Sequence, residues 1–289
     1  GGDSDAAEQR LANARVHLAA ASERLDGSST ALAAFVPVVA QQVEAASVAV
    51  DQGLAIAKSA DDLVRAADYD QLSEIGERQG RALGVYWAEH NVTIDAVYTG
   101  PRVRHRKFAE LAAASYRERG FNWPEPVVLN ELDEFDMDGM AQHLGPQLSS
   151  RDAEFARLVQ EFLECTEEDE RQRAFQRMFE RVLRHWQAAE SLEGNVETWP
   201  AFRARIAGVI RRIQTEAPRG ARVAVFTSGG VIGCSLQQAL GVTDEKMLEL
   251  SWRVRNASLT DFVFTPERIT LDTFNMIPHL QDPELWTYR

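Results

Sequence analysis

The sequence predicts an α/β domain with a mostly parallel sheet, preceded by a separate α-helical segment. Two observations carry this prediction. Residues 1–67 are rich in alanine, contain almost no aromatic residues and repeat their apolar positions every seven residues. From residue 68 to residue 289, short runs of β-branched and aromatic residues alternate with amphipathic helical stretches. Strands that are separated by helices are typical of an α/β fold with a parallel sheet.

The first segment, residues 1–67, has the spacing of a helical seam. Leu11, Leu18 and Leu25 recur at intervals of seven, and a second series continues this interval after a turn. The second series consists of Val36, Val43, Val50, Ala57 and Val64. Such sustained spacing predicts an α-helical hairpin or a coiled-coil seam. We expect this segment to be a packing arm or an element through which the chain forms a homo-oligomer.

The charge balance limits the partners of the chain. Its 289 residues include 31 Lys and Arg against 44 Asp and Glu, a formal net charge of -13. This balance argues against nucleic-acid binding and against a polybasic membrane contact. The sequence shows no signal peptide and no apolar run that could span a bilayer, so we expect a cytoplasmic location. Cys165 and Cys234 lie far apart without a partner motif, which predicts neither a disulfide framework nor a metal site.

Helices and strands alternate along residues 68–289. Ser73 is expected to cap the first helix, and Pro200 and Gly220 are expected to mark the two ends of a later one. The predicted order is a helix over 72–90, a strand over 92–100, a helix over 102–120, a short strand and acidic loop over 125–135, a long helical stretch over 150–189, a helix over 198–220, a strand and helix over 223–242, and a hairpin over 261–275 that turns at Pro266.

The stretch from Val223 to Val242 has the pattern of an anion site. Its sequence, VAVFTSGGVIGCSLQQALGV, reads as a strand that runs through Gly229 and Gly230 into a helix. Backbone N–H groups at a helix N-terminus can face an anion, and glycine lets the anion approach closely. A tight strand-to-helix turn needs glycine just as much, so the pattern alone leaves both interpretations open.

Four segments, in this order and spacing, resemble the histidine phosphatase superfamily, the phosphoglycerate-mutase-like proteins. Residues 72–82 (LSEIGERQGRA) are similar to the first helix of that family, L-T-x-x-G…Q-A. Residues 97–104 (VYTGPRVR) are similar to its V-Y-S-S-P-L-x-R, and residues 225–230 (VFTSGG) to its V-x-S-H-G-G. Residues 275–280 (NMIPHL) resemble a tail of bacterial members. The resemblance spans roughly residues 68–289.

This resemblance implies a three-layer, phosphoglycerate-mutase-like fold and a phosphate chemistry. In the family, arginines and histidines bind the phosphate dianion, a histidine attacks phosphorus, and an acidic residue protonates the leaving oxygen. The arginines supply the positive charge, so no metal and no cofactor is implied. The implied partner is phosphate or a phosphorylated small molecule.

The family's roles carry over to five positions of this sequence. Arg104 matches the arginine that clamps phosphate, and Gly229 and Gly230 match the glycines of the binding turn. Ser228 stands where the family has its second histidine, and a hydroxyl can donate a hydrogen bond to phosphate but brings no positive charge. Glu131 matches the general acid. Solvated side chains are the alternative for both the arginine and the carboxylate, and other acids of the same loop are alternatives to the matched one: Asp133 and Glu134.

The family's nucleophile is missing from this sequence. It lies in an Arg-His-Gly motif at the end of the first strand, and no Arg-His-Gly occurs anywhere in the chain. Residues 63–65 (LVR) and 51–53 (DQG) are the nearest substitutes, but the seven-residue spacing places both in a helix. His105 follows Arg104 by one position along a helix, so its side chain is expected to face away from the phosphate site.

The strand that carries this motif lies inside the family's sheet. Its absence leaves backbone donors and acceptors unpaired unless the N-terminal region fills the gap. Residues 33–40 (AAFVPVVA) are the only run of that region apolar enough to do so, and Pro37 counts against a central strand.

Three functions follow as hypotheses. The first is a phosphatase-like domain that binds phosphate or a phosphomonoester and is catalytically impaired because the nucleophilic histidine is missing. The second is an active, metal-independent phosphomonoesterase with a nucleophile that the sequence does not identify. The third is an interaction protein that associates with itself through residues 1–67.

Overall fold

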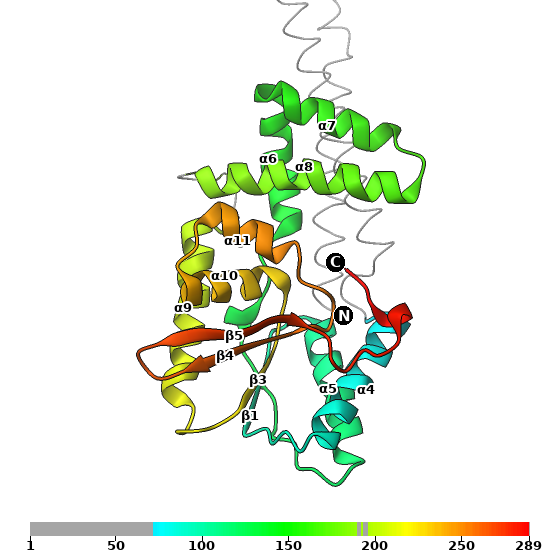
Figure 1. Cartoon of the computed structure of the whole chain (residues 1–289). Coiled ribbons are helices and arrows are strands. Elements are labelled where there is room, and N and C mark those ends of the chain that lie inside the picture. Colours follow the sequence, from blue (N-terminus) through cyan, green and yellow to red (C-terminus); the bar gives the residue numbers. More distant parts are fainter. Residues whose placement is uncertain (1–71, 190–191, 193–195, 289) are drawn as a thin grey trace, which may run out of the picture. The chain divides into compact units, whose positions relative to one another are not determined.

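The computed structural model describes residues 72–189, 192 and 196–288 (Figure 1). The helical hairpin predicted for residues 1–67, together with the strand considered at residues 33–40, lies outside this described part of the chain.

Two compact units make up the chain. Residues 68–135 and 200–289 belong to an α/β unit, and residues 136–199 belong to a helical unit. The predicted phosphate site falls entirely within the α/β unit.

A three-stranded parallel sheet forms the centre of the α/β unit, in the order β2-β1-β3. The strands are β1 (Ala96–Thr99), β2 (Val127–Val128) and β3 (Val223–Phe226). The last residue of β1, Thr99, pairs with the last residue of β3, Phe226. The carboxyl ends of β1 and β3 are therefore level, and the residues that follow them meet at one edge of the sheet.

Helices cover both sides of this sheet. Figure 1 shows α4 (Glu74–Glu89) and α5 (Val103–Arg117) on one side of β1 and β3, and α9 (Trp199–Glu216) on the other side. The predicted cap is present, because the Ser73 hydroxyl accepts a hydrogen bond from the Gly76 N–H at 3.1 Å. Two further helices follow β3, α10 (Gly229–Leu240) and α11 (Asp244–Ser251). The α/β class with a parallel sheet is confirmed.

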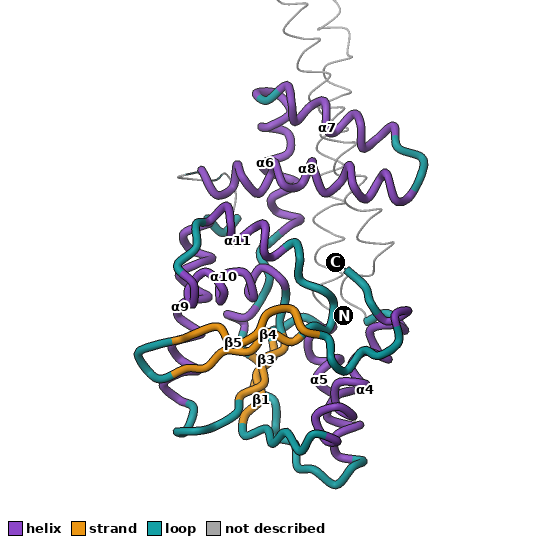
Figure 2. Tube along the Cα trace, viewed as in Figure 1, coloured by secondary structure: helices purple, strands orange, loops and turns teal. Residues whose placement is uncertain are grey.

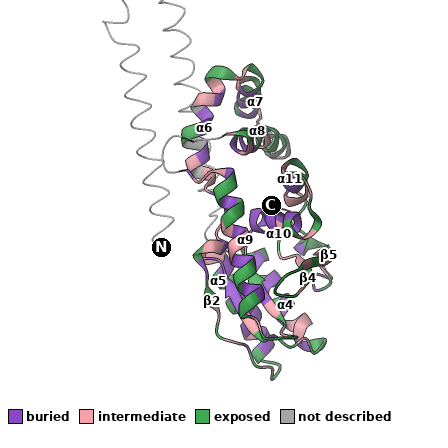
Figure 3. Ribbon diagram, turned by 90° about the vertical axis from the view of Figure 1, so that its left-hand side faces the viewer, coloured by how far each residue is buried: buried purple, intermediate pink, exposed green. Residues whose placement is uncertain are grey.

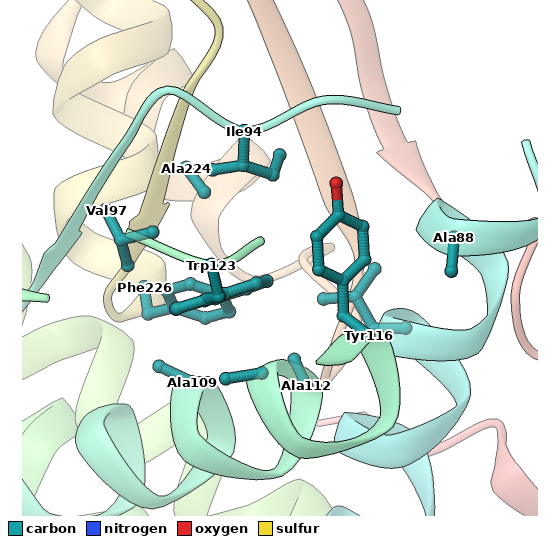
Figure 4. Close-up of a cluster of buried hydrophobic side chains, with 11 residues drawn as sticks. Ala88, Ile94, Val97, Ala109, Ala112, Tyr116, Trp123, Ala224 and Phe226 are labelled. Atoms are coloured by element: carbon teal, nitrogen blue, oxygen red, sulfur yellow. The ribbon is translucent and has the colours of Figure 1, made fainter. Parts of the chain in front are cut away.

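A hydrophobic cluster fills the space between the sheet and the helices α4 and α5 (Figure 4). The rings of Trp123 and Phe226 lie against each other there, with 6.1 Å between their centroids. The two helices approach closely because α4 carries glycine at the contact: a Cβ at Gly84 would overlap the carbonyl of Ala112 on α5. The cluster consists of Leu83, Ala88, Ile94, Val97, Ala109, Ala112, Ala113, Tyr116, Trp123, Ala224 and Phe226.

The predicted hairpin forms a second, two-stranded sheet. Strands β4 (Leu259–Phe264) and β5 (Ile269–Met276) pair antiparallel, and a short 3-10 turn, η3 (Pro283–Leu285), follows them. Among the described residues, β3 pairs with β1 alone, so no strand of the described chain joins the two sheets.

The long helical stretch expected over residues 150–189 consists of two helices, and a further helix precedes it. The helical unit contains α6 (Met137–Arg151), α7 (Ala153–Glu164) and α8 (Glu168–Ala188), and Figure 2 shows the turn between α7 and α8. Asp152 separates α6 from α7. Its side chain accepts hydrogen bonds from the N–H groups of Glu154 and Phe155 at the start of α7, and the hydrogen bond from the Arg181 guanidinium lowers the pKa of this carboxyl. Figure 3 shows a buried and an exposed side on α7 and α8.

None of the helices in the described part of the chain combines the length and the apolar character that crossing a membrane requires.

Candidate functional site

The carboxyl ends of β1 and β3 bring the predicted site residues together. Gly100 directly follows β1, and its N–H donates to the carbonyl of Phe226 at 2.9 Å. Ser228 follows β3 and is the N-cap residue of α10. Since α5 begins at Val103, the first turns of α5 and α10 start at the same edge of the sheet.

Arg104 and Ser228 are in direct contact, although 124 residues separate them in the sequence. The Arg104 Nη2 donates to the Ser228 Oγ at 3.0 Å. The side chain of Ser228 is buried, and that of Arg104 is half-buried. The resemblance predicted that both residues belong to one site, and the geometry brings the two together.

The expectation for His105 is wrong. Its Nε2 lies 2.6 Å from the Ser228 Oγ, and the residue is only 4% exposed. Two consecutive residues in the first turn of α5, Arg104 and His105, therefore both contact the Ser228 hydroxyl. A sequence signal did exist, because His105 shares the buried stripe of α5 with Ala109, Ala112 and Tyr116.

Gly100 makes room for the imidazole of His105. A Cβ at this position would collide with the Nδ1 of His105 and would lie 2.8 Å from the carbonyl oxygen of Leu132. Only glycine therefore lets the end of β1 pack directly against the ring.

An internal carboxylate occupies the N-terminus of α10. The Gly230 N–H donates to the Glu134 Oε2 at 3.2 Å, and the N–H of Phe135 donates to the Oε1 of the same side chain, also at 3.2 Å. Glu134 is 4% exposed, and a Cβ at Gly230 would collide with its carboxylate. Gly229, the first residue of α10, is buried beside them. The oxyanion at this helix N-terminus is therefore a side chain of the protein itself.

Hydrogen bonds from three elements hold the loop that carries Glu134. The Arg102 Nε donates to the Asp133 Oδ1 at 2.6 Å, and the Thr227 hydroxyl donates to the Leu132 carbonyl at 2.8 Å. Arg205, on α9, donates to the carbonyls of Glu131 and Asp133 at 2.8 and 3.0 Å. The loop is therefore fixed mainly through its backbone.

Glu131, the predicted general acid, lies in the 3-10 turn η2 (Asn130–Leu132). Its backbone carbonyl accepts the hydrogen bond from Arg205, while its carboxylate adds to the effect of Glu216 in raising the pKa of Arg212. Of the acids in this loop, Glu134 contacts the N-terminus of α10, and it was weighed in the sequence only as an alternative.

Cys234, one helical turn beyond Gly230, is the nearest cysteine along α10, and its thiol is not ionised. Burial raises the pKa of its thiol to about 12, and the charge of Glu134 adds to this effect. The thiol therefore stays protonated at neutral pH. Within the described residues, no three His, Cys, Asp or Glu side chains lie close enough together to hold a metal ion.

A family model of the histidine phosphatase superfamily (branch 1) matches residues 58–193 and 160–277 of the chain. No curated protein matches significantly.

Solved structures of three phosphate-handling enzymes are similar to the chain, each over 71% of its length. The chain is 19% identical to a putative alpha-ribazole-5'-P phosphatase from Escherichia coli, with 83% of that chain covered and a TM-score of 0.48. It is 16% identical to a phosphoglycerate mutase from Bacillus anthracis, with 81% covered and a TM-score of 0.45. A mycobacterial glucosyl-3-phosphoglycerate phosphatase shows 18% identity, 88% coverage and a TM-score of 0.46.

Proposed function

This chain belongs to the histidine phosphatase superfamily, and from that premise we propose that it binds phosphate or a phosphomonoester at the carboxyl ends of β1 and β3. Arg104 is the clamp for the phosphate oxygens in this proposal, Ser228 a hydrogen-bond donor, and Gly229 and Gly230 the backbone that faces the ligand. The contact between Arg104 and Ser228 is the observation that supports it most directly.

The internal carboxylate gives independent support. Glu134 is itself an oxyanion that accepts a hydrogen bond from the Gly230 N–H, so this amide is already oriented toward negative charge. Arg104 adds a guanidinium, whose planar set of donors suits phosphate oxygens. A phosphate ligand would compete with Glu134 for the same amide.

The proposal includes impaired turnover by the family's route. No Arg-His-Gly motif occurs in the sequence, so the imidazole that would form a phosphohistidine at that position is missing. Binding then remains without efficient hydrolysis.

Titration calorimetry with inorganic phosphate tests the binding site. We expect Arg104→Ala to weaken binding by about 2 kcal/mol, roughly 30-fold, because a charge-assisted hydrogen bond is lost. Arg106→Ala is the matched control, since Arg106 is an exposed arginine in the same turn of α5. Equal affinities of the wild-type chain and Arg104→Ala, or no binding by either, would contradict the proposal.

Two isosteric variants test which carboxylate, that of Glu134 or that of Glu131, opposes phosphate binding at the α10 N-terminus. We expect Glu134→Gln to raise the affinity for phosphate roughly tenfold, about 1.4 kcal/mol, because it removes a negative charge from the α10 N-terminus. Glu131→Gln should leave the affinity unchanged, because the carboxylate that accepts from the Gly230 N–H is that of Glu134. A raised affinity for Glu131→Gln and an unchanged affinity for Glu134→Gln would instead place the Glu131 carboxylate beside the bound phosphate.

Self-association through residues 1–67 stays a prediction, because this segment lies outside the described residues. Sedimentation of the chain with and without the segment checks it: a monomer in both cases would exclude this role.

A further inference from the structure

We infer that Ser228 and His105 form a nucleophile–base pair, through which an activated phosphodonor phosphorylates Ser228. The inference rests on the proposed function, because the phosphoryl group must bind beside Arg104 before it is transferred. It also supplies a nucleophile that the family's histidine route does not provide here.

The contacts of the Ser228 hydroxyl are those that activation of a nucleophile needs. Its Oγ lies 2.6 Å from the His105 Nε2, within the reach of a general base. The same Oγ accepts a hydrogen bond from Arg104, a residue that can only donate. The pair requires the His105 tautomer that carries its proton on Nδ1, because only then can Nε2 accept the Oγ proton. The nearby guanidinium stabilises the negative charge that develops on Oγ as this proton leaves.

Packing holds both partners in place. The ring of His105 lies against Gly100, where any side chain would displace it, and the residue belongs to the buried stripe of α5. Ser228 is fixed at the junction of β3 and α10 and is 7% exposed. Neither side chain has to move far to keep the contact, which is the preorganisation that a catalytic pair requires.

The surroundings of Ser228 suit a phosphoryl group. Arg104 contacts its hydroxyl, and the N–H groups in the first turn of α10 follow directly in the chain. The Gly230 N–H already holds one oxygen of Glu134, which shows that an oxyanion fits there. A phosphoryl group on Oγ would direct its oxygens toward these donors.

The transfer step balances without a metal or any further reactant. With acetyl phosphate as donor, the bond between the Ser228 Oγ and phosphorus forms while the bond between phosphorus and the acetyl oxygen breaks. The electron pair of the broken bond leaves with acetate. The Oγ proton passes to the His105 Nε2 and from there to water. Because phosphate monoesters hydrolyse extremely slowly without catalysis, the phosphoserine is expected to persist, in agreement with impaired turnover.

Acid-quenched labelling of the full chain with radiolabelled acetyl phosphate tests the inference, because phosphoserine survives acid and phosphohistidine does not. We expect one acid-stable phosphoryl group per chain, which mass spectrometry of the digest places on Ser228. Ser228→Ala should abolish the label, and His105→Gln should slow labelling at least roughly 100-fold. Ser235→Ala is the matched control on the same helix, since its hydroxyl only donates to the Val231 carbonyl.

Phosphate binding by the same proteins separates this inference from the proposed function. Normal binding without an acid-stable label on Ser228 would overturn the inference alone, and no binding would overturn both. Labelling of His105→Gln at the wild-type rate would show that His105 is not the base for Ser228. Thermal melts verify folding, and if His105→Gln does not fold, His105→Asn takes its place.

Discussion

Two clusters of the α/β unit lie next to β3. The hydrophobic cluster described above packs against this strand, and a polar cluster, formed by Arg104, His105 and Ser228, lies at its carboxyl end. Ala224 and Phe226 point from β3 into the hydrophobic cluster, and two residues later Ser228 begins the polar cluster. The first cluster consists mostly of residues between 83 and 123, whereas the second joins side chains more than 120 residues apart.

This difference shows how stability and function are divided within the α/β unit. Apolar area removed from water stabilises the first cluster, and this contribution has little directional dependence. Hydrogen bonds of defined geometry organise the second cluster, where a small displacement removes a contact. Substitutions in the hydrophobic cluster should therefore lower stability, and substitutions in the polar cluster should lower binding.

Truncation of the Trp123 side chain tests whether the hydrophobic cluster determines stability, and it should change the free energy of unfolding most. Trp123 is 4% exposed and packs against Tyr116 and Phe226. We expect Trp123→Ala to lower the free energy of unfolding by about 3–5 kcal/mol, because a large cavity remains. Urea denaturation measures this change. Phosphate binding by the folded fraction should persist, and a variant that stays stable but loses binding would break the comparison.

The two clusters can also be compared through two buried histidines. His105 contacts the Ser228 hydroxyl, whereas His279 is buried beside an aromatic ring. His279 packs near Tyr86, and burial lowers the pKa of its imidazole from 6.5 to about 4, against the opposing effect of the Ala257 backbone. As the pH falls through this window, the unfolded chain binds a proton that the folded chain does not. The free energy of unfolding should therefore fall by about 3 kcal/mol between pH 6.5 and pH 4.

Denaturation of His279→Phe at pH 7, 5 and 4 checks the pH dependence. The variant should show a shallower loss of stability than the wild-type chain, because one group that titrates between the two states is gone. An equally steep loss would assign the pH dependence to other groups.

Helical glycines provide the smallest and most closely matched test. A Cβ at Gly84 would overlap the Ala112 carbonyl, so Gly84→Ala should lower the free energy of unfolding by about 1–3 kcal/mol. A Cβ at Gly208, within α9, would meet nothing within 4 Å, so Gly208→Ala should raise it by up to about 1 kcal/mol. Thermal melts of both variants compare them directly. If both variants lost the same free energy of unfolding, the close approach of α4 and α5 at Gly84 would not explain the loss.

The sequence by itself determined the elements of the α/β unit and the family. Apolar periodicity, the cap at Ser73 and the glycines after the helices depend on residues that are close in the chain, so the pattern reports them directly. The positions of Arg104 and Ser228 could be matched for the same reason, since each lies in a short motif that follows a strand.

Only the tertiary structure decided which side chains meet. His105 reaches Ser228 because the parallel register sets the ends of β1 and β3 level, and the sequence does not encode that register locally. Glu134 rather than Glu131 contacts the α10 N-terminus because Arg102, Arg205 and Thr227 hold the loop from outside it. Long-range polar contacts depend on where whole elements pack, and no local pattern contains that information.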